Sequence, residues 1–313
     1  MNKLKELNKL IGNTPLIKIK YKIGGKTKTS YFKLEWYNLT GSIKDRVAYN
    51  IIYDAYKNNL LKPNQPIVET TSGNMGLSFC AVGAHLKHKV VIFMPKFLSV
   101  ERQELLKLYG AELHLTNSFE EAFEKAKDYA YAHNGFLTMQ FENPLNMLAH
   151  YKTTAIEISK KIKHPKCFVA GIGTSGTLMG VGKYFKENYN SKIIALEPKS
   201  SSILSTGVSQ GKHKLQGLAD DIIPKLYDKN IIDDIVSITD EDAIAMAQKL
   251  CKKFGLGVGI SSGANFIGTA ICKYNNCISV FTDDNKKYIS TDLITPISTP
   301  LVDSIELISF KVM

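Results

Sequence analysis

The chain has 313 residues, of which 44% are apolar, and this length and composition suit a single two-lobed enzyme with a large core. Its net charge of +11 comes from dispersed lysines without a dense basic tract, so we expect no nucleic-acid partner; a lysine-rich surface and an affinity for anionic small molecules are the remaining explanations. No apolar run approaches a membrane span and residues 1–6 lack a signal-peptide core, so we expect no membrane association and a cytoplasmic location.

The order of predicted elements indicates an α/β fold. A strand over 29–36 leads to a helix over 47–56, so that Lys44 falls in the first helical turn. From Ser42 onward strands and helices alternate, which predicts mostly parallel sheets covered on both faces. The first lobe continues with strands over 67–70, 90–95 and 112–115, which are followed by helices over 77–86, 100–109 and 119–132.

The second lobe repeats this alternation after residue 148. Its predicted elements are helices over 149–162, 177–188, 241–254 and 263–274 and strands over 167–170, 193–196 and 278–281, with a turn over 259–263. Residues 199–230 are predicted to be irregular, and a loop of this length in a compact domain is usually functional or mobile. The tail over 295–313 alternates apolar and polar residues, which fits either an edge strand or a dimer contact.

The five cysteines are scattered along the chain and form no CxxC pair. No histidine lies at metal-ligand spacing from them. We therefore interpret them as reduced, mostly buried thiols and expect no metal site. They are Cys80, Cys167, Cys251, Cys272 and Cys277.

Lys44 is the candidate for covalent chemistry. A cation in the first turn of a helix faces the positive end of the helix dipole, and a partly buried ammonium loses its proton more readily than a free one. A lysine with a lowered pKa can form a Schiff base. For this segment alone, the alternative is a surface lysine beside Asp45, which favours the N-terminal turn.

Four turns follow predicted strands, at Lys44, Thr71, Gly171 and Ser261, and ligands bind at the carboxyl ends of strands in open α/β sheets. The turn over 171–177 opens a helix with small residues, so its N–H groups can converge on a phosphate. Its glycine spacing also fits a dinucleotide site, although the turn lies in the middle of the chain. A tight turn without a ligand is a further alternative.

The turn over 71–76 offers hydroxyls and an amide at a helix N-terminus, which suits a carboxylate. The alternative is that Thr71 or Ser72 is an N-cap. An amine that forms an imine, a phosphate cup and a carboxylate site are together the parts that hold pyridoxal phosphate and an amino acid.

The chain resembles the cysteine synthase and cystathionine β-synthase family over nearly its whole length. Seven motifs occur in the family's order and spacing, at 11–16, 41–46, 71–74, 140–144, 173–177, 213–217 and 259–263. These fold-type II enzymes use pyridoxal 5'-phosphate. The resemblance implies a homodimer of two-lobed subunits, each lobe a mostly parallel twisted sheet covered by helices on both faces. It also implies a smaller mobile lobe over 37–145 and a larger cofactor-binding lobe formed by 1–36 and 146–313.

The resemblance also implies roles for individual residues. Lys44 would bind the cofactor covalently and later serve as base and acid at Cα, Asn74 would bond the ring hydroxyl, and Ser261 would contact the pyridine nitrogen. The phosphate would be held by Gly173, Thr174, Ser175, Gly176 and Thr177. The substrate would be bound by Thr71, Ser72, Gly73, Met75, Gln140 and Gly217, with Thr71, Ser72 and Gln140 on its carboxylate.

The implied reaction is β-replacement on a serine-type amino acid through an aminoacrylate intermediate, as in making cysteine from O-acetylserine and sulfide. A serine at the ring nitrogen stabilises a pyridinium less than an aspartate would, so loss of a group from Cβ is favoured over transamination. The expected partners are small amino acids and sulfide or a thiol. A cofactor-free homologue that binds without turnover is disfavoured by the intact lysine.

Three places depart from the cysteine synthase pattern. Met75 stands where threonine is usual, and Ser175 where glycine is usual. Asp220 and Asp221 occupy a loop that is small and uncharged in enzymes using O-acetylserine. A carboxyl group there can protonate a poor leaving group, so the alternative function is activation of L-cysteine or L-serine itself by a hydrogen sulfide-releasing desulfhydrase, a cystathionine synthase or a lanthionine synthase. The structural alternative is that these aspartates cap a turn before Pro224.

Overall fold

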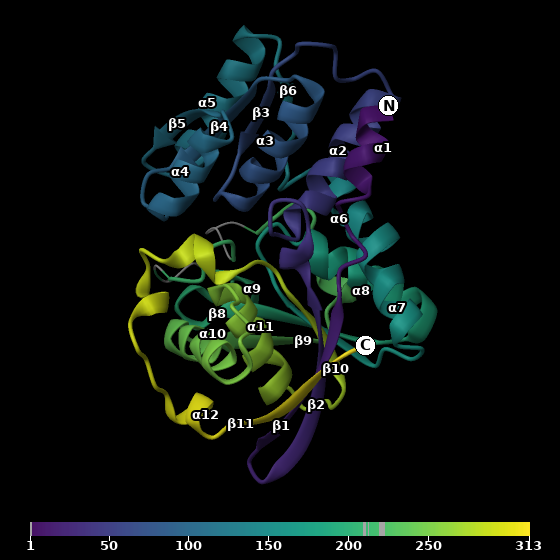
Figure 1. The fold of residues 1–313 in the computed structure, drawn as a ribbon, viewed down its shortest axis with the longest axis vertical. Helices are drawn as coiled ribbons and strands as arrows, with labels where there is room; N and C mark the ends of the chain where they lie inside the picture. The colour runs from purple at the N-terminus through teal and green to yellow at the C-terminus, as the bar shows by residue number, and fades with distance from the viewer. Residues whose placement is uncertain (1, 209–210, 212, 219–222) are drawn as a thin grey trace.

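The computed structural model describes residues 2–208, 211, 213–218 and 223–313 and arranges them around two separate sheets (Figure 1). The strands are β1 (Leu16–Ile23), β2 (Lys26–Leu34), β3 (Ile67–Thr70), β4 (Val90–Pro95), β5 (Glu112–Thr116), β6 (Phe136–Leu137), β7 (Cys167–Gly171), β8 (Lys192–Pro198), β9 (Asp234–Ile238), β10 (Cys277–Phe281) and β11 (Glu306–Val312). The α-helices are α1 (Asn2–Asn8), α2 (Lys44–Lys57), α3 (Asn74–Leu86), α4 (Val100–Leu108), α5 (Phe119–Ala132), α6 (Pro144–Ala149), α7 (Ala155–Lys161), α8 (Gly176–Tyr189), α9 (Ile203–Thr206), α10 (Asp240–Phe254), α11 (Ile260–Ile271) and α12 (Pro300–Asp303). Over these ranges, none of the helices combines the length and apolar character that crossing a membrane requires.

The smaller sheet has the strand order β5-β4-β3-β6, and all its strands are parallel. Successive strand residues face opposite sides. Val68 and Val91 therefore pack against Ala126 of α5, whereas Ile67 and Ile92 face the core that α2 and α3 cover. Burial on both faces explains why these strands are continuous apolar runs.

The larger sheet has the strand order β11-β1-β2-β10-β7-β8-β9. The strands from β2 to β9 in this order run parallel, while β1 pairs antiparallel with both β2 and β11. On one face of this sheet, α10 and α11 form a core with Phe32 and Phe281. On the other face, α7 and α8 form a core with Phe168. The C-terminal tail thus ends as an edge strand, one of the two structures predicted for it.

Most of the predicted elements are confirmed, several with the same bounds, and two near the pocket differ in detail from the prediction. The helix predicted over 149–162 is interrupted by a π-helical turn at His150–Thr154, a feature frequent at functional sites. The turn predicted over 259–263 belongs to α11 from Ile260 onward. The glycine in this segment lets α11 pack closely against α10, because a Cβ on Gly263 would lie 2.1 Å from the carbonyl oxygen of Ala243 in α10.

The start of α2 is fixed by a buried ion-pair network. Arg46 donates from Nε and Nη2 to the two oxygens of Glu35, at 2.7 and 2.9 Å, and from Nη1 to Glu157 of α7 at 2.6 Å. Burial by itself would raise the pKa of Glu35, but Arg46 and Lys33 hold it at about 2. Since Arg46 lies two residues after Lys44, this network positions the lysine.

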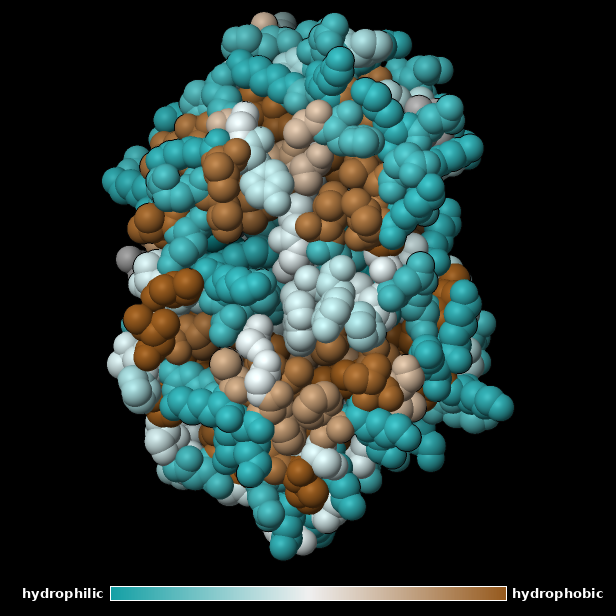
Figure 2. Space-filling model, viewed as in Figure 1, coloured by the Kyte–Doolittle hydropathy of each residue, from teal (hydrophilic) through white to brown (hydrophobic). Residues whose placement is uncertain are grey.

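On the face shown in Figure 2, apolar side chains form separate patches in the upper and lower parts, with hydrophilic and neutral side chains between and around them. Large exposed apolar residues occur around both sheets, among them Leu108 near β5 and Val312 in β11.

Candidate active site

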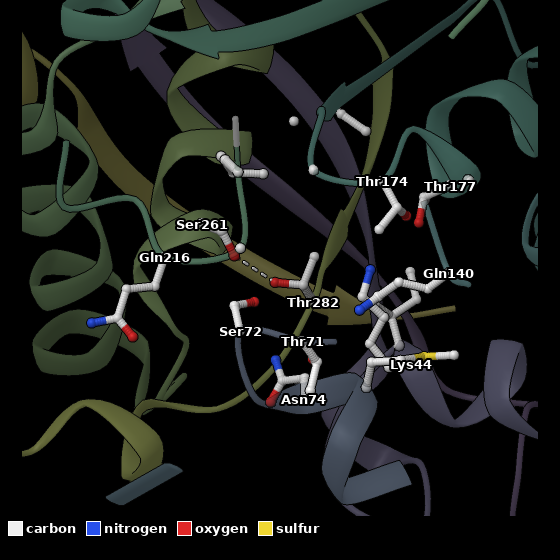
Figure 3. Close-up of a pocket in the computed structure, with 18 of the residues that line it drawn as sticks. Lys44, Thr71, Ser72, Asn74, Gln140, Thr174, Thr177, Gln216, Ser261 and Thr282 are labelled. Atoms are coloured by element: carbon white, nitrogen blue, oxygen red, sulfur yellow. Dashed lines mark hydrogen bonds between the residues drawn. The ribbon is translucent and has the colours of Figure 1, made fainter. Parts of the chain in front are cut away.

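One pocket gathers the turns that follow strands of both sheets (Figure 3). All four turns singled out from the sequence contribute to its wall, through Lys44, Thr71, Gly171 and Ser261. Thr71 and Gly171 lie at strand ends as predicted, whereas Ser261 follows α10 and not a strand. The space that they enclose is about 750 Å³ with its open mouth included. The structure therefore brings together the residue types that the sequence singled out.

Lys44 is the first residue of α2 and is a half-buried residue of the pocket wall. Its backbone N–H donates to Ser42 Oγ at 3.3 Å. Hydrogen bonds from Lys287 and to Asp45 fix the loop before it. Lys287 Nζ donates to the Thr40 carbonyl at 3.1 Å, and the buried carboxylate of Asp45 accepts from the N–H and hydroxyl of Thr40, both at 2.7 Å. Asp45 thus braces the loop that presents Lys44 to the pocket.

The turn over 173–177 leads into α8, with Ser175 in the left-handed region at φ 66°. Thr174 Oγ1 accepts from Asn146 Nδ2 at 2.8 Å, and Thr177 Oγ1 lies 3.2 Å from His150 Nε2. A Cβ on Gly173 would lie 2.2 Å from the Gly217 carbonyl oxygen, so only glycine lets these two loops approach. The reason for expecting glycine at position 175 is different: the backbone there has a positive φ, which glycine adopts without strain.

His150 orients this turn without adding charge to it. Burial, together with the positive charges of Lys44 and Arg46, lowers the pKa of His150 to about 3. The imidazole is therefore neutral near pH 7. Its two ring nitrogens lie within hydrogen-bond distance of the hydroxyls of Thr154 and Thr177, at 3.0 and 3.2 Å.

Replacing Ser175 by glycine should stabilise the fold and weaken cofactor binding. A non-glycine residue in the left-handed region costs about 1 to 2 kcal/mol, which glycine removes. The same change removes a hydroxyl from the turn expected to hold the phosphate. We expect a higher midpoint of urea unfolding for the apoprotein and faster cofactor loss on dialysis. Ser200→Gly, at an exposed position outside the pocket, is the control, and tighter cofactor binding by Ser175→Gly would contradict the prediction.

The turn after β3 is held by a buried arginine that the sequence analysis missed. Arg102 of α4 donates from Nη1 to the Ser72 carbonyl at 2.8 Å and from Nη2 to Tyr288 Oη at 2.7 Å. The Thr71 hydroxyl accepts from the Gly73 N–H at 3.0 Å. Gly73 is the N-cap of α3 and no side chain caps the helix, so the proposal that Thr71 or Ser72 is an N-cap is wrong.

Asn74 belongs to the same network. Its Nδ2 donates to Asp283 Oδ2 at 2.7 Å, and Tyr288 Oη donates to the same oxygen at 2.9 Å. Asp283 lies just beyond β10, so its place after a strand was the signal that could have identified it. Met75, the next residue after Asn74, is buried in the core that backs the pocket and also lines its wall.

Gln140 reaches the pocket from the loop after β6. Its Nε2 donates to the Thr70 carbonyl at 2.9 Å. The buried Glu69 accepts from the N–H groups of Thr70 and Gln140, at 2.8 and 3.2 Å, and from the Thr138 hydroxyl at 2.6 Å. Glu69 therefore joins the two loops proposed to hold the substrate carboxylate. Burial raises its pKa to about 7, and these three donors oppose the rise.

Replacing Glu69 by glutamine should remove one source of pH-dependent stability. The folded pKa of about 7 lies above the ordinary value of 4.5, so ionising Glu69 opposes folding. Its contribution to the free energy of unfolding is highest below pH 4.5 and falls by about 3 kcal/mol as the pH rises through 7. Urea unfolding at pH 5 and pH 8 measures this difference, which should shrink in Glu69→Gln. The exposed control Glu120→Gln should retain it; equal behaviour of the two variants would contradict the assignment.

Ser261 lies in the first turn of α11, and its Oγ is 2.7 Å from Thr282 Oγ1 (Figure 3). Thr282, which also lines the pocket, was missed although it directly follows the strand predicted over 278–281. Gly217 lines the wall next to Gln216 and Leu218. Asp220 and Asp221 lie outside the described residues.

The pocket fits pyridoxal 5'-phosphate. Two buried wall oxygens, Asn74 Oδ1 and Ser175 Oγ, have no hydrogen-bond partner within the described residues. They belong to the turns expected to meet the ring hydroxyl and the phosphate. A buried polar atom without a partner costs free energy, which a ligand supplying that partner recovers.

Comparisons with known proteins agree with this geometry. The family model described as "Pyridoxal-phosphate dependent enzyme" matches residues 7–282. A cysteine synthase from Staphylococcus aureus and cysteine synthase B from Campylobacter jejuni are each 39% identical over 298 residues. These matches cover 92% of this chain and 96% and 98% of the relatives.

Solved structures are similar over the whole chain. A hydrogen sulfide-producing enzyme from Fusobacterium nucleatum is 44% identical, with a TM-score of 0.95 over 100% of this chain and 99% of that one. A mutant of the enzyme with an aspartate replaced by asparagine was solved with an alpha-aminoacrylate intermediate, with a TM-score of 0.96 and 43% identity over the same shares. The cysteine synthase from Entamoeba histolytica is 35% identical, with a TM-score of 0.86 over 95% of this chain and 93% of that one. The chain therefore belongs to the pyridoxal-phosphate dependent enzymes and, within them, to the cysteine synthase family.

Proposed function

We propose that this chain catalyses pyridoxal-phosphate dependent β-replacement on a serine-type amino acid, as a cysteine synthase does when it makes cysteine from O-acetylserine and sulfide. The observation that carries the proposal is the single pocket in which Lys44, the turn over 173–177 and Ser261 meet. An amine for covalent attachment, a phosphate cup and a hydroxyl for the ring nitrogen are the contacts that this cofactor requires.

The cofactor, when bound, withdraws electrons from Cα of the attached amino acid, which acidifies the Cα proton and permits loss of the group on Cβ. Lys44 holds the cofactor covalently and then moves the proton at Cα. Ser261 offers a neutral hydroxyl to the ring nitrogen, and its bond to Thr282 at 2.7 Å orients that hydroxyl. A neutral partner weakens electron withdrawal by the ring, which favours loss from Cβ over transamination.

The turn over 71–74 and Gln140 hold the substrate carboxylate in this proposal. Three features support it. The turn precedes the N-terminus of α3, which attracts anions. The Gln140 amide is anchored on the Thr70 carbonyl, so it stands beside the turn. Glu69 fixes the backbone of both loops from behind.

A second candidate function is activation of L-cysteine or L-serine itself, by a hydrogen sulfide-releasing desulfhydrase, a cystathionine synthase or a lanthionine synthase. The similarity to the hydrogen sulfide-producing enzyme over 100% of this chain favours it. That enzyme's aspartate-to-asparagine mutant was solved with an alpha-aminoacrylate intermediate, which supports an aspartate that acts at Cβ after the leaving group has departed, when the nucleophile or a water attacks. In this chain the candidates are Asp220 and Asp221.

A substrate panel separates the two functions. Purified holoenzyme is tested in three separate samples. One contains O-acetylserine and sulfide, one contains L-cysteine alone, and one contains L-serine and a thiol. Released sulfide and amino-acid products are measured in each. Cysteine formation from O-acetylserine without sulfide release from L-cysteine supports the first function. Rapid sulfide release from L-cysteine supports the second. Absence of turnover in every sample would refute both.

Asp221→Asn should distinguish an acid at Cβ from a turn residue. Acetate leaves without protonation, so we expect the reaction with O-acetylserine to be nearly unchanged. Loss of a general acid should lower turnover of L-cysteine or L-serine by roughly 10²- to 10⁴-fold. Asp220→Asn tests the second candidate in the same way, because it removes the same charge one residue earlier. Equal losses with all three substrates would reduce Asp221 to a structural role.

The lobes, the oligomer and the location remain part of the proposal. Residues 37–145, which contain β3 to β6, form a smaller mobile lobe, and residues 1–36 with 146–313 form the cofactor-binding lobe. Movement of the smaller lobe is tested by small-angle scattering with and without substrate. A homodimer, which the resemblance to the family implies, is tested by light scattering. A cytoplasmic enzyme without membrane or nucleic-acid partners is tested by cell fractionation and by salt-dependent binding assays.

A further inference from the structure

Three cysteines that are distant in the sequence lie close together in the larger lobe. They lie where β7 and β10 begin, at the end of these strands opposite the active site. Cys167 and Cys277 begin the neighbouring parallel strands β7 and β10, in which Phe168 pairs with Ile278. Each cysteine directly precedes one member of that pair, so both side chains face the same side of the sheet. Cys272 follows the end of α11, which contacts both strands.

The three sulfur atoms form a compact, enclosed cluster. They all lie within 4.8 Å of one another, and Cys272 Sγ is 3.1 Å from Cys277 Sγ. The exposed fractions of Cys167, Cys272 and Cys277 are 0%, 5% and 0%. All three are free thiols. Aliphatic residues such as Val169 and Ile194 complete the surroundings, so the sulfurs converge inside a largely apolar shell.

A positive charge lies close to this cluster. Lys28 Nζ donates to the carbonyls of Ala270 and Cys272, at 2.9 and 2.8 Å, which places an ammonium beside the sulfurs. A thiolate is the form of cysteine that binds metals.

The number of ligands selects the kind of ion. Within the described part of the chain, no histidine or carboxylate joins the three sulfurs as a further ligand. Structural zinc sites are almost always tetrahedral with four protein ligands. Soft thiolate ligands also select copper(I), a d¹⁰ monovalent ion for which three sulfurs in a plane are sufficient.

We propose that Cys167, Cys272 and Cys277 form a three-sulfur site that binds one copper(I) ion per chain. Binding replaces thiol protons, which are released to solvent, and no electron is transferred. The site is distinct from the active site: Ser261 lies at the start of α11 and Cys272 just beyond its end, about 17 Å along the helix axis. An ion there would join α11 to β7 and β10 and so stabilise the larger lobe.

The test is an anaerobic titration of the holoenzyme with copper(I) in competition with a chromogenic copper(I) chelator. We expect one ion per chain, proton release on binding and a higher thermal midpoint. Cys272→Ser should lose affinity by more than the roughly 10- to 100-fold that removal of a hydrogen-bonding partner of a ligand costs. Cys80→Ser, which removes a buried thiol in the smaller sheet's core, is the matched control and should bind as the unmodified chain does.

X-ray absorption of the copper-loaded unmodified chain tests the site even if a variant fails to fold, and three sulfur neighbours around copper are expected. Equal binding by Cys272→Ser and Cys80→Ser would overturn the proposal. So would a copper site with fewer than three sulfurs, or stoichiometric zinc held more tightly than copper(I) at the competing chelator concentrations.

Discussion

Replacing Lys44 by alanine should abolish both turnover and the visible absorption band that a lysine-bound cofactor gives. The amine is the group in this pocket that is proposed to attach the cofactor covalently and to move the Cα proton. Loss of a catalytic base alone costs about 10²- to 10⁴-fold, and loss of covalent attachment adds to this. Spectra of the purified protein with added cofactor and a product assay measure the two effects.

The control for Lys44→Ala is Lys57→Ala, which removes an exposed lysine from the last turn of the same helix. This variant should keep the absorption band and normal turnover. Partial recovery of Lys44→Ala by added small amines would further support a missing base. Survival of the band or of turnover in Lys44→Ala would show that another residue binds the cofactor, and the proposed function would lose its main support.

Replacing Glu35 by glutamine should lower the free energy of unfolding by about 3 to 5 kcal/mol, the usual cost of removing one partner of a buried ion pair. Glu35 is fully buried and accepts two hydrogen bonds from Arg46. Glutamine keeps the shape but leaves the guanidinium with less compensating charge. Urea unfolding of the holoenzyme at pH 7, at saturating cofactor, measures the change.

The control for Glu35→Gln is Glu6→Gln, because the pair of Glu6 with Lys9 is exposed to solvent. Exposed pairs contribute about 0 to 1 kcal/mol, so this variant should differ little from the unmodified chain. The pKa of Glu35, about 2, is below its ordinary 4.5. Its stabilising effect is therefore present above pH 4.5 and is lost as the pH falls through 2. Equal unfolding midpoints for the two variants would contradict the role given to the network.

Residues that meet only after folding explain what the sequence analysis missed. Arg102, Asp283 and Tyr288 are far apart or unremarkable in the sequence, yet their side chains join one buried network beside Asn74. Glu69 lies within a short strand whose sequence pattern indicates that the strand is buried. The pattern does not indicate which hydrogen-bond donors surround the Glu69 carboxylate. Such partners depend on which loops the fold brings together, and the local periodicity of the sequence does not predict which loops meet.

The sequence by itself determined the alternation of strands and helices, the place of Lys44 at a helix start and the turns at strand ends. These features follow from local periodicity and from residues such as glycine and serine, whose preferences act over a few positions. Tertiary structure decided the rest. It interrupted a helix at His150, extended α11 back through Ser261 and brought Cys167 to Cys272, because packing between distant segments sets those contacts.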